Sequence, residues 1–212
     1  MKAGALAVSL TLGSGAGLAW AVTIDNSVPT ANYRHSCSEG QNGTVCQTDN
    51  ADVYFYMDLS DGAGDGRDNK LEPGDQAVVR SVMANSYNGT DLNTYYDATP
   101  VFSGDSETDI YYEEDTPPPG LIGIAWCNDD SPAPAYSCDQ QHVRIAHGYY
   151  DYQYSYGLVC HETGHAVGLL HGENAYPSVD NNDHDILHCM VKSDDTTRGL
   201  GPTNVANINA NY

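Results

Sequence analysis

The sequence predicts an α+β domain built on a mixed β-sheet. Most of the strand candidates precede the main helices, the two kinds of segment rarely alternate as strand–helix–strand, and no internal repeat is present. With 212 residues the chain is long enough to bury a substantial core in one domain, or at most two.

The strand candidates are short runs rich in β-branched and aromatic residues. They are residues 52–59, 92–98, 100–104, 108–114, 121–127 and 142–148. The stiff turn "TPPPG" (116–120) separates the fourth run from the fifth. Residues 22–50 are polar and rich in Asn, Ser and Thr, so we expect an irregular N-terminal segment there.

Three segments have apolar residues at helical spacing. The first is 72–87, with a proline near its start, and the second is about 154–167, ending at Gly168. The third, 202–212, closes the chain and places on one face Val205, Ile208 and Tyr212. Between the second and third helices the chain is rich in Asn and Asp, and we expect it to be irregular.

Residues 1–21 are typical of an export signal. One lysine precedes an apolar stretch, and Ala19-Trp20-Ala21 gives the small-x-small pattern at which signal peptidases cut, so we expect cleavage after Ala21. Glycines and serines at 13–17 interrupt the apolar run, which makes it too short to anchor the chain in a membrane. We therefore expect a secreted, extracellular protein.

The chain has six cysteines, an even number that fits an oxidising compartment. Neighbours in sequence suggest the bridges Cys37–Cys46 and Cys127–Cys138, which leave Cys160 with Cys189. Fifteen connectivities are possible for six cysteines, so the pairing stays open at this point.

The net charge of −21 comes from 29 acidic residues against 8 Lys plus Arg. Such a surface repels nucleic acid and anionic membranes, so we expect neither as a partner. Solubility is the favoured reason for the charge; calcium binding and tolerance of high salt are alternatives. We expect a monomer.

The stretch "CHETGHAVGLLHG" (160–172) has the spacing of a metal site. On a helix, His161 and His165 lie on one face, and both can reach one zinc ion at about 2.0–2.1 Å. Glu162, one step round the helix, flanks the metal and can take a proton from its water. A sharp turn at Gly168 brings His171 back, and three imidazoles leave the fourth position of a tetrahedral zinc open.

The alternative is that these histidines are ordinary surface or core residues. HExxH by itself occurs by chance in many proteins, but the added Gly168 and His171 favour the catalytic metal. His184 or His188 could substitute as a ligand if His171 pointed away. We treat all five remaining histidines as structural or solvent-facing: His35, His142, His147, His184 and His188.

"HETGHAVGLLH" matches the signature HExxHxxGxxH of the metzincin zinc metallopeptidases, and the resemblance is most specific over 160–190. It implies a metzincin-like catalytic domain over 51–212, with a twisted mixed sheet, an active-site helix and a small irregular C-terminal subdomain. It also implies a methionine in a tight turn beneath the metal, for which Met190 is the candidate.

The stretch "SETDIYYEEDTPPPGLIGIAWC" is similar to the matrixin-type arrangement, in which a sheet strand leads through a loop into an edge strand. The resemblance implies that an extended substrate pairs with that edge strand. The candidate residues are Leu121, Ile122, Gly123, Ile124 and Ala125. By the same resemblance, residues 191–194 wall the pocket for the substrate residue after the cut.

Cys160 and Cys189 each stand immediately before a signature residue. If the methionine turn lies beneath the zinc helix, the two cysteines come together, and a bridge closing a loop of about 30 residues adds roughly 3–4 kcal/mol. Cys160 as a zinc ligand is the rival interpretation, but it lies about 100° round the helix from His161. We therefore expect a disulfide.

Residues 61–72 resemble a calcium loop, with oxygen ligands at positions 1, 5, 9 and 12. The four candidates are Asp61, Asp65, Asn69 and Glu72. Position 3 is Ala63, however, and a strand rather than a helix precedes the loop. An acidic turn is the favoured interpretation, and Ca²⁺ is a secondary expectation.

These features together predict a secreted endopeptidase with catalytic Zn²⁺ and a polypeptide substrate, in which Glu162 acts as the general base. The main alternative is a secreted, calcium-stabilised binding or adhesion module whose zinc site is not catalytic. Two other ligand sets are less favoured: a third ligand at Glu173, which lies too near the helix, or at Asp183 or Asp185, which leaves Gly168 and His171 unexplained.

Overall fold

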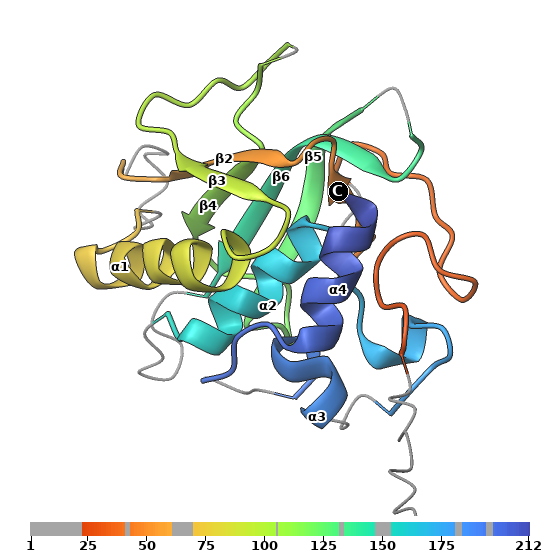
Figure 1. Ribbon diagram of the computed structural model, residues 1–212. Coiled ribbons are helices and arrows are strands. Elements are labelled where there is room, and N and C mark those ends of the chain that lie inside the picture. Colours follow the sequence, from red (N-terminus) through yellow and green to blue (C-terminus); the bar gives the residue numbers. More distant parts are fainter. Residues whose placement is uncertain are drawn as a thin grey trace, which may run out of the picture.

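A six-stranded sheet with helices packed against one face forms the body of the protein (Figure 1). The computed structural model describes residues 23–40, 43–60, 70–104, 106–131, 134–146, 154–180, 184–193 and 197–212. The strands are β1 (Gln47–Thr48), β2 (Asp52–Met57), β3 (Asn93–Tyr96), β4 (Ile110–Glu114), β5 (Gly123–Asp130) and β6 (Ser137–Ile145). The helices are α1 (Pro73–Val82), η1 (Met83–Tyr87), α2 (Tyr156–Ala166), η2 (Gly172–Asn174), α3 (His184–Leu187), η3 (His188–Met190) and α4 (Pro202–Asn211).

The sheet is mixed, as expected, and mostly parallel. Strands β3, β2, β4 and β6 are parallel neighbours in that order, and β1 extends the sheet beside the start of β6. Strand β5 runs antiparallel to β6 and pairs with no other strand in the described part of the chain. The unit β2–α1–β3 is a βαβ crossover, so the fold is better called α/β than α+β.

The core lies between the sheet and helices α1 and α2. Strand β2 alternates buried and exposed side chains, which directs Val53, Phe55 and Met57 inward. Helix α1 meets this face with Val79 and Val82, both fully buried. Each such side chain contributes roughly 1.5–3 kcal/mol through burial. The resulting platform supports α2, which carries the histidine motif.

Two of the predicted strands differ from the structure. Residues 100–104 form no strand: Val101 N donates to the Thr108 hydroxyl, and Gly104 has φ 86°. Strand β6 begins at Ser137, five residues before the expected start at 142, because the Cys127–Cys138 disulfide joins β5 to β6 there. The predicted helix 72–87 is confirmed, with its last turn widened to a π-helix.

The three disulfides are Cys37–Cys46, Cys127–Cys138 and Cys160–Cys189, the pairs that the sequence suggested. Such a set indicates an oxidising, extracellular type of environment. Among the described residues, none of the helices is both long and apolar enough to cross a bilayer. The proposed export signal, residues 1–21, lies outside the described residues.

The N-terminal segment packs between α4 and the chain that follows α2. It is irregular apart from β1, but Ile24, Asn26 and Val28 are all buried. The predicted closing helix is confirmed as α4. Its buried face includes Asn207, whose Nδ2 donates to the Ile24 carbonyl at 3.0 Å, an inward asparagine that periodicity did not anticipate.

Asp109, which immediately precedes β4, should make stability depend on pH. Burial raises the pKa of this carboxyl to about 7, although its Oδ2 accepts from Tyr54 N at 2.7 Å. In the unfolded chain an aspartate titrates near pH 3.9, so the folded protein holds an extra proton between about pH 4 and 7. The Asp109 contribution to the free energy of unfolding should therefore fall by roughly 2–4 kcal/mol as pH rises through that window, and comparison with a variant that lacks the carboxyl isolates it.

Asp109→Asn removes this ionisation and keeps an acceptor for Tyr54 N. In urea unfolding between pH 4 and 8, the variant should lose less stability than the wild type. Asp52→Asn, at an exposed position of β2, is the matched control and should follow the wild type. Equal pH profiles for wild type and Asp109→Asn would contradict the prediction.

Candidate metal centre

Helix α2 presents the first two histidines on one face. Ser155 caps its start, where the side-chain oxygen accepts from Leu158 N at 3.2 Å. The helix ends at Ala166, and Gly168 then adopts φ 88°, which makes the sharp turn that the sequence predicted there. This bend turns the chain back, so that His171 returns toward the helix instead of continuing along its axis.

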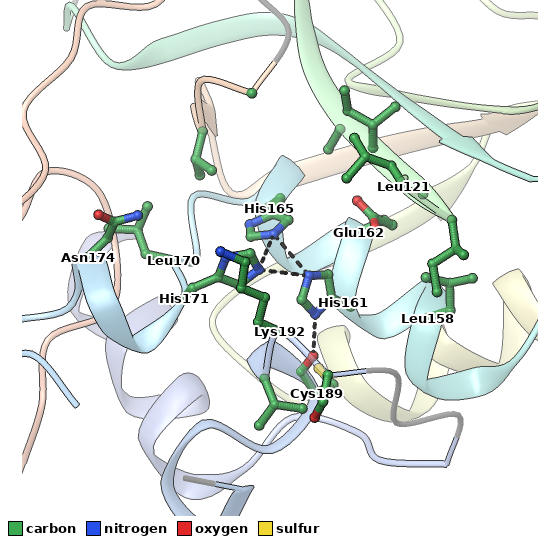
Figure 2. Close-up of a pocket in the computed structure, with 18 of the residues that line it drawn as sticks. Leu121, Leu158, His161, Glu162, His165, Leu170, His171, Asn174, Cys189 and Lys192 are labelled. Atoms are coloured by element: carbon green, nitrogen blue, oxygen red, sulfur yellow. Dashed lines mark hydrogen bonds between the residues drawn. The ribbon is translucent and has the colours of Figure 1, made fainter. Parts of the chain in front are cut away.

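The three imidazoles converge on one point (Figure 2). The Nε2 atom of His161 lies 3.1 Å from that of His165 and 3.0 Å from that of His171, and the remaining distance is 3.2 Å. Nitrogens with this spacing can all lie about 2.0–2.1 Å from a single ion, which is the Zn–N bond length. The three-histidine group could therefore hold a metal ion.

The hydrogen bonds of the far ring nitrogens fix the tautomers of two histidines. His161 Nδ1 lies 2.7 Å from the Cys189 carbonyl oxygen, and His165 Nδ1 lies 2.8 Å from that of Leu169. A carbonyl oxygen only accepts, so both Nδ1 atoms carry the hydrogen and both Nε2 atoms are bare in the neutral rings. Bare lone pairs facing each other repel, and a cation between them removes that repulsion. The donor set therefore fits a metal ion.

The surroundings keep the rings neutral. Burial lowers the pKa of His161, and burial together with the two neighbouring rings lowers that of His165 further. The pKa of His171 falls to about 3, mainly through burial and then through His161. Neutral imidazole is the form that binds metals.

Glu162 lies beside this group, buried between α2 and the first residue of β5. In Figure 2 its carboxylate lies between the histidines and Leu121. A Cβ atom on Gly123 would come within 2.5 Å of Glu162 Oε1 and 2.7 Å of its Cγ, so only glycine leaves room for this side chain. Burial raises the pKa of Glu162 to about 8 in the absence of a cation.

Met190 lies beneath α2, at the end of η3. Its Sδ packs directly onto Gly164, between the two helical histidines, and its side chain is fully buried. The Cys160–Cys189 disulfide joins α2 to η3, and Cys189 directly precedes Met190. Cys160 is thus bonded to sulfur, and the rival role as a metal ligand is not open to it.

A cavity of about 370 Å³ opens over the histidines. One wall is formed by β5 and the residues before it, and all five edge-strand candidates line it, although the strand begins only at Gly123. Leu158, Val191 and Lys192 also line the cavity, and Figure 2 shows Leu158 and Lys192 near the histidines. The cavity is therefore lined by a strand, by apolar side chains and by the three-histidine group.

The other residues considered as ligands lie elsewhere. Glu173 is exposed and pairs with Lys192 at 3.3 Å, and Asp185 is exposed on α3. The ring of His188 packs against Gly201, away from the three-histidine group. Of the calcium candidates, Asp61, Asp65 and Asn69 lie outside the described residues, and Glu72 precedes α1. His147 and Asp183 also lie outside them.

Several residues of the site were missed by sequence reasoning. The carbonyls of Leu169 and Cys189 orient two ligands, and Tyr33 and Val45 of the N-terminal segment line the cavity. Backbone carbonyls leave no mark in a sequence, because every residue has one. The two N-terminal residues reach the site only through the tertiary fold.

No protein-family model matches this chain, and no curated protein matches it.

Proposed function

We propose that this protein is a secreted, zinc-dependent endopeptidase of the metzincin type. One observation carries the proposal: three converging imidazole nitrogens lie next to a buried glutamate at the floor of an open cavity. A purely structural metal site has no use for a free carboxylate at that position, whereas hydrolysis needs a base there.

His161, His165 and His171 would hold the ion. Zinc bound by three imidazoles supplies a Lewis acid that lowers the pKa of its water to about 7 and polarises a peptide carbonyl. The other residues of the site orient the ligands and transfer protons. The Cys189 and Leu169 carbonyls hold His161 and His165 in the tautomer that points Nε2 at the ion.

Glu162 is assigned the proton transfers. Its carboxylate accepts a proton from the attacking water and then delivers it to the leaving amine nitrogen, so the same oxygen serves first as base and then as acid. The Glu162 side chain is buried, which limits the access of bulk water to the carboxylate during these transfers.

Strand β5 is the proposed docking edge for the substrate. Its antiparallel partner β6 occupies one side, and the other side borders the cavity. An extended polypeptide can add to such an edge through backbone hydrogen bonds, which suits an endopeptidase because recognition does not need a chain end. Leu158 and Val191 offer an apolar wall to a substrate side chain.

Digestion of casein by the purified protein, with and without a chelator, tests the proposal. We expect cleavage at internal bonds, loss of activity on chelation and recovery on adding Zn²⁺. A protein that binds zinc tightly and cleaves nothing would instead support the adhesion-module alternative.

Gly123→Ala should impair turnover specifically. The added Cβ would meet the Glu162 carboxylate and displace it, because the carboxylate oxygen and Cγ both lie within 2.7 Å of the new atom. A misplacement of about 1 Å can cost about 10²-fold in rate, so we expect kcat to fall by about that factor. Zinc content should stay at the wild-type value. The matched control is Gly89→Ala, where a Cβ meets open space and kcat should not change; a fully active Gly123→Ala enzyme would contradict the placement of Glu162.

A further inference from the structure

The loop that carries His171 is held by the N-terminal segment, residues 25–32. Asp25 and Tyr176 exchange backbone hydrogen bonds of 2.9 and 2.7 Å, and Val28 N donates to the Gly168 carbonyl at 2.9 Å. These contacts lie on both sides of His171. In Figure 1 the red-orange segment accordingly runs beside the blue chain that follows α2.

Two side chains of the same segment add further bonds beyond His171. The Thr30 hydroxyl donates to the Asn174 carbonyl at 2.7 Å, and Asn32 Nδ2 donates to the Ala175 carbonyl at 2.6 Å. Thr30 is buried and Asn32 is exposed. Residues 25–32 thus form a frame around the third histidine.

Asn26 is the tightest part of this frame. Its carbonyl accepts from Leu170 N at 2.7 Å, while its side-chain Nδ2 donates to the Leu170 carbonyl at 3.1 Å. Asn26 is fully buried, and its Oδ1 accepts from Asn207 Nδ2 on α4, which fixes the orientation of the amide. One residue therefore satisfies both backbone groups of Leu170.

These two hydrogen bonds, which we call the Asn26 clamp, matter because Leu170 lies between two groups of the metal centre. The preceding residue, Leu169, offers the carbonyl that orients His165 Nδ1, and the following residue is His171 itself. A rotation of the backbone at Leu170 would move both groups together. Asn26 is therefore placed to act on two of the three imidazoles through the backbone.

We propose that Asn26 is a positioning residue for the metal centre, acting through Leu170 on His165 and His171. This inference rests on the metal centre of the proposed function and extends it to the N-terminal segment. Residues that orient metal ligands typically contribute 10–100-fold to metal affinity. The same factor is expected here, because without the Asn26 amide the Leu170 backbone is free to rotate and would displace the Leu169 carbonyl and His171 together.

The test compares Asn26→Ala with Val79→Ala in the full-length chain. Val79 is buried in α1, so its truncation loosens the core without touching the frame. Zinc affinity is measured by competition with a chromophoric chelator, and ligand geometry by the visible absorption of the Co²⁺-substituted protein. We expect Asn26→Ala to bind zinc 10–100-fold more weakly with an altered Co²⁺ spectrum, and Val79→Ala to match the wild type in both.

Wild-type affinity in Asn26→Ala would overturn the proposal, as would an equal loss of affinity in both variants, which would point to general loosening. If Asn26→Ala does not fold, the exposed Asn32→Ala carries the test. It should bind zinc a few-fold more weakly, and unchanged affinity would count against the frame. A wild-type chain that binds no metal would overturn the proposed function itself, which keeps the two failures apart.

Discussion

Glu162→Gln should abolish peptide hydrolysis and leave the metal in place. Glutamine has nearly the same shape as glutamate, so the fit against Gly123 is kept, but an amide cannot take up the proton of the attacking water. General-base catalysis of this kind is worth roughly 10²–10⁴-fold in kcat. Release of an internally quenched peptide and zinc content per chain, measured on the same preparation, check both halves of the prediction.

Glu173→Gln is the matched control for this experiment. Glu173 lines the same cavity but is exposed and pairs with Lys192. Replacing Glu173 changes the charge near the three histidines by the same amount as replacing Glu162. Because Glu173 is not the proposed base, the Glu173→Gln variant should retain most of the activity. If Glu162→Gln keeps wild-type turnover, Glu162 is not the base and the assigned mechanism is wrong.

Removing the Cys160–Cys189 disulfide by a double Ala substitution should both destabilise the fold and weaken metal binding. The bridge closes a loop of about 30 residues, so its loss should lower the free energy of unfolding by roughly 3–4 kcal/mol. It also tethers the Cys189 carbonyl that accepts from His161 Nδ1. We therefore expect zinc affinity to fall by about 10-fold or more. Calorimetry and chelator competition measure the two effects.

The control removes Cys37–Cys46, a bridge with no metal ligand next to it. That variant should lose roughly 2–3 kcal/mol of stability and bind zinc as the wild type does. The comparison separates a global loss of stability from a local effect on His161. Equal zinc affinity in the two double variants would show that the Cys160–Cys189 bridge does not position the ligand.

The local parts of the metal centre could be predicted from sequence because they follow from short spacings. An interval of four residues places His161 and His165 on one helical face, and a glycine at 168 permits the bend that returns His171. The position of Cys160 and Cys189 beside signature residues likewise indicated their pairing, and the structure has that bridge.

Other parts depend on contacts between distant segments and have no periodic signal. The order of the parallel strands and the early start of β6 are set by pairing across the sheet. Residues 100–104 have a strand-like composition, yet Val101 N donates to a threonine side chain and not to the backbone of a neighbouring strand. The hydrogen bond between Asn26 and Leu170 joins residues 144 positions apart. Composition cannot reveal such a contact.

X-ray absorption at the zinc edge, on protein purified without added chelator, tests the central claim most directly. If the three imidazoles bind one ion, the first shell should contain about three ring nitrogens and one oxygen at about 2.0–2.1 Å, with outer-shell scattering from imidazole carbons. A sulfur shell near about 2.3 Å, a shell of oxygen alone, or a protein without zinc would contradict the account.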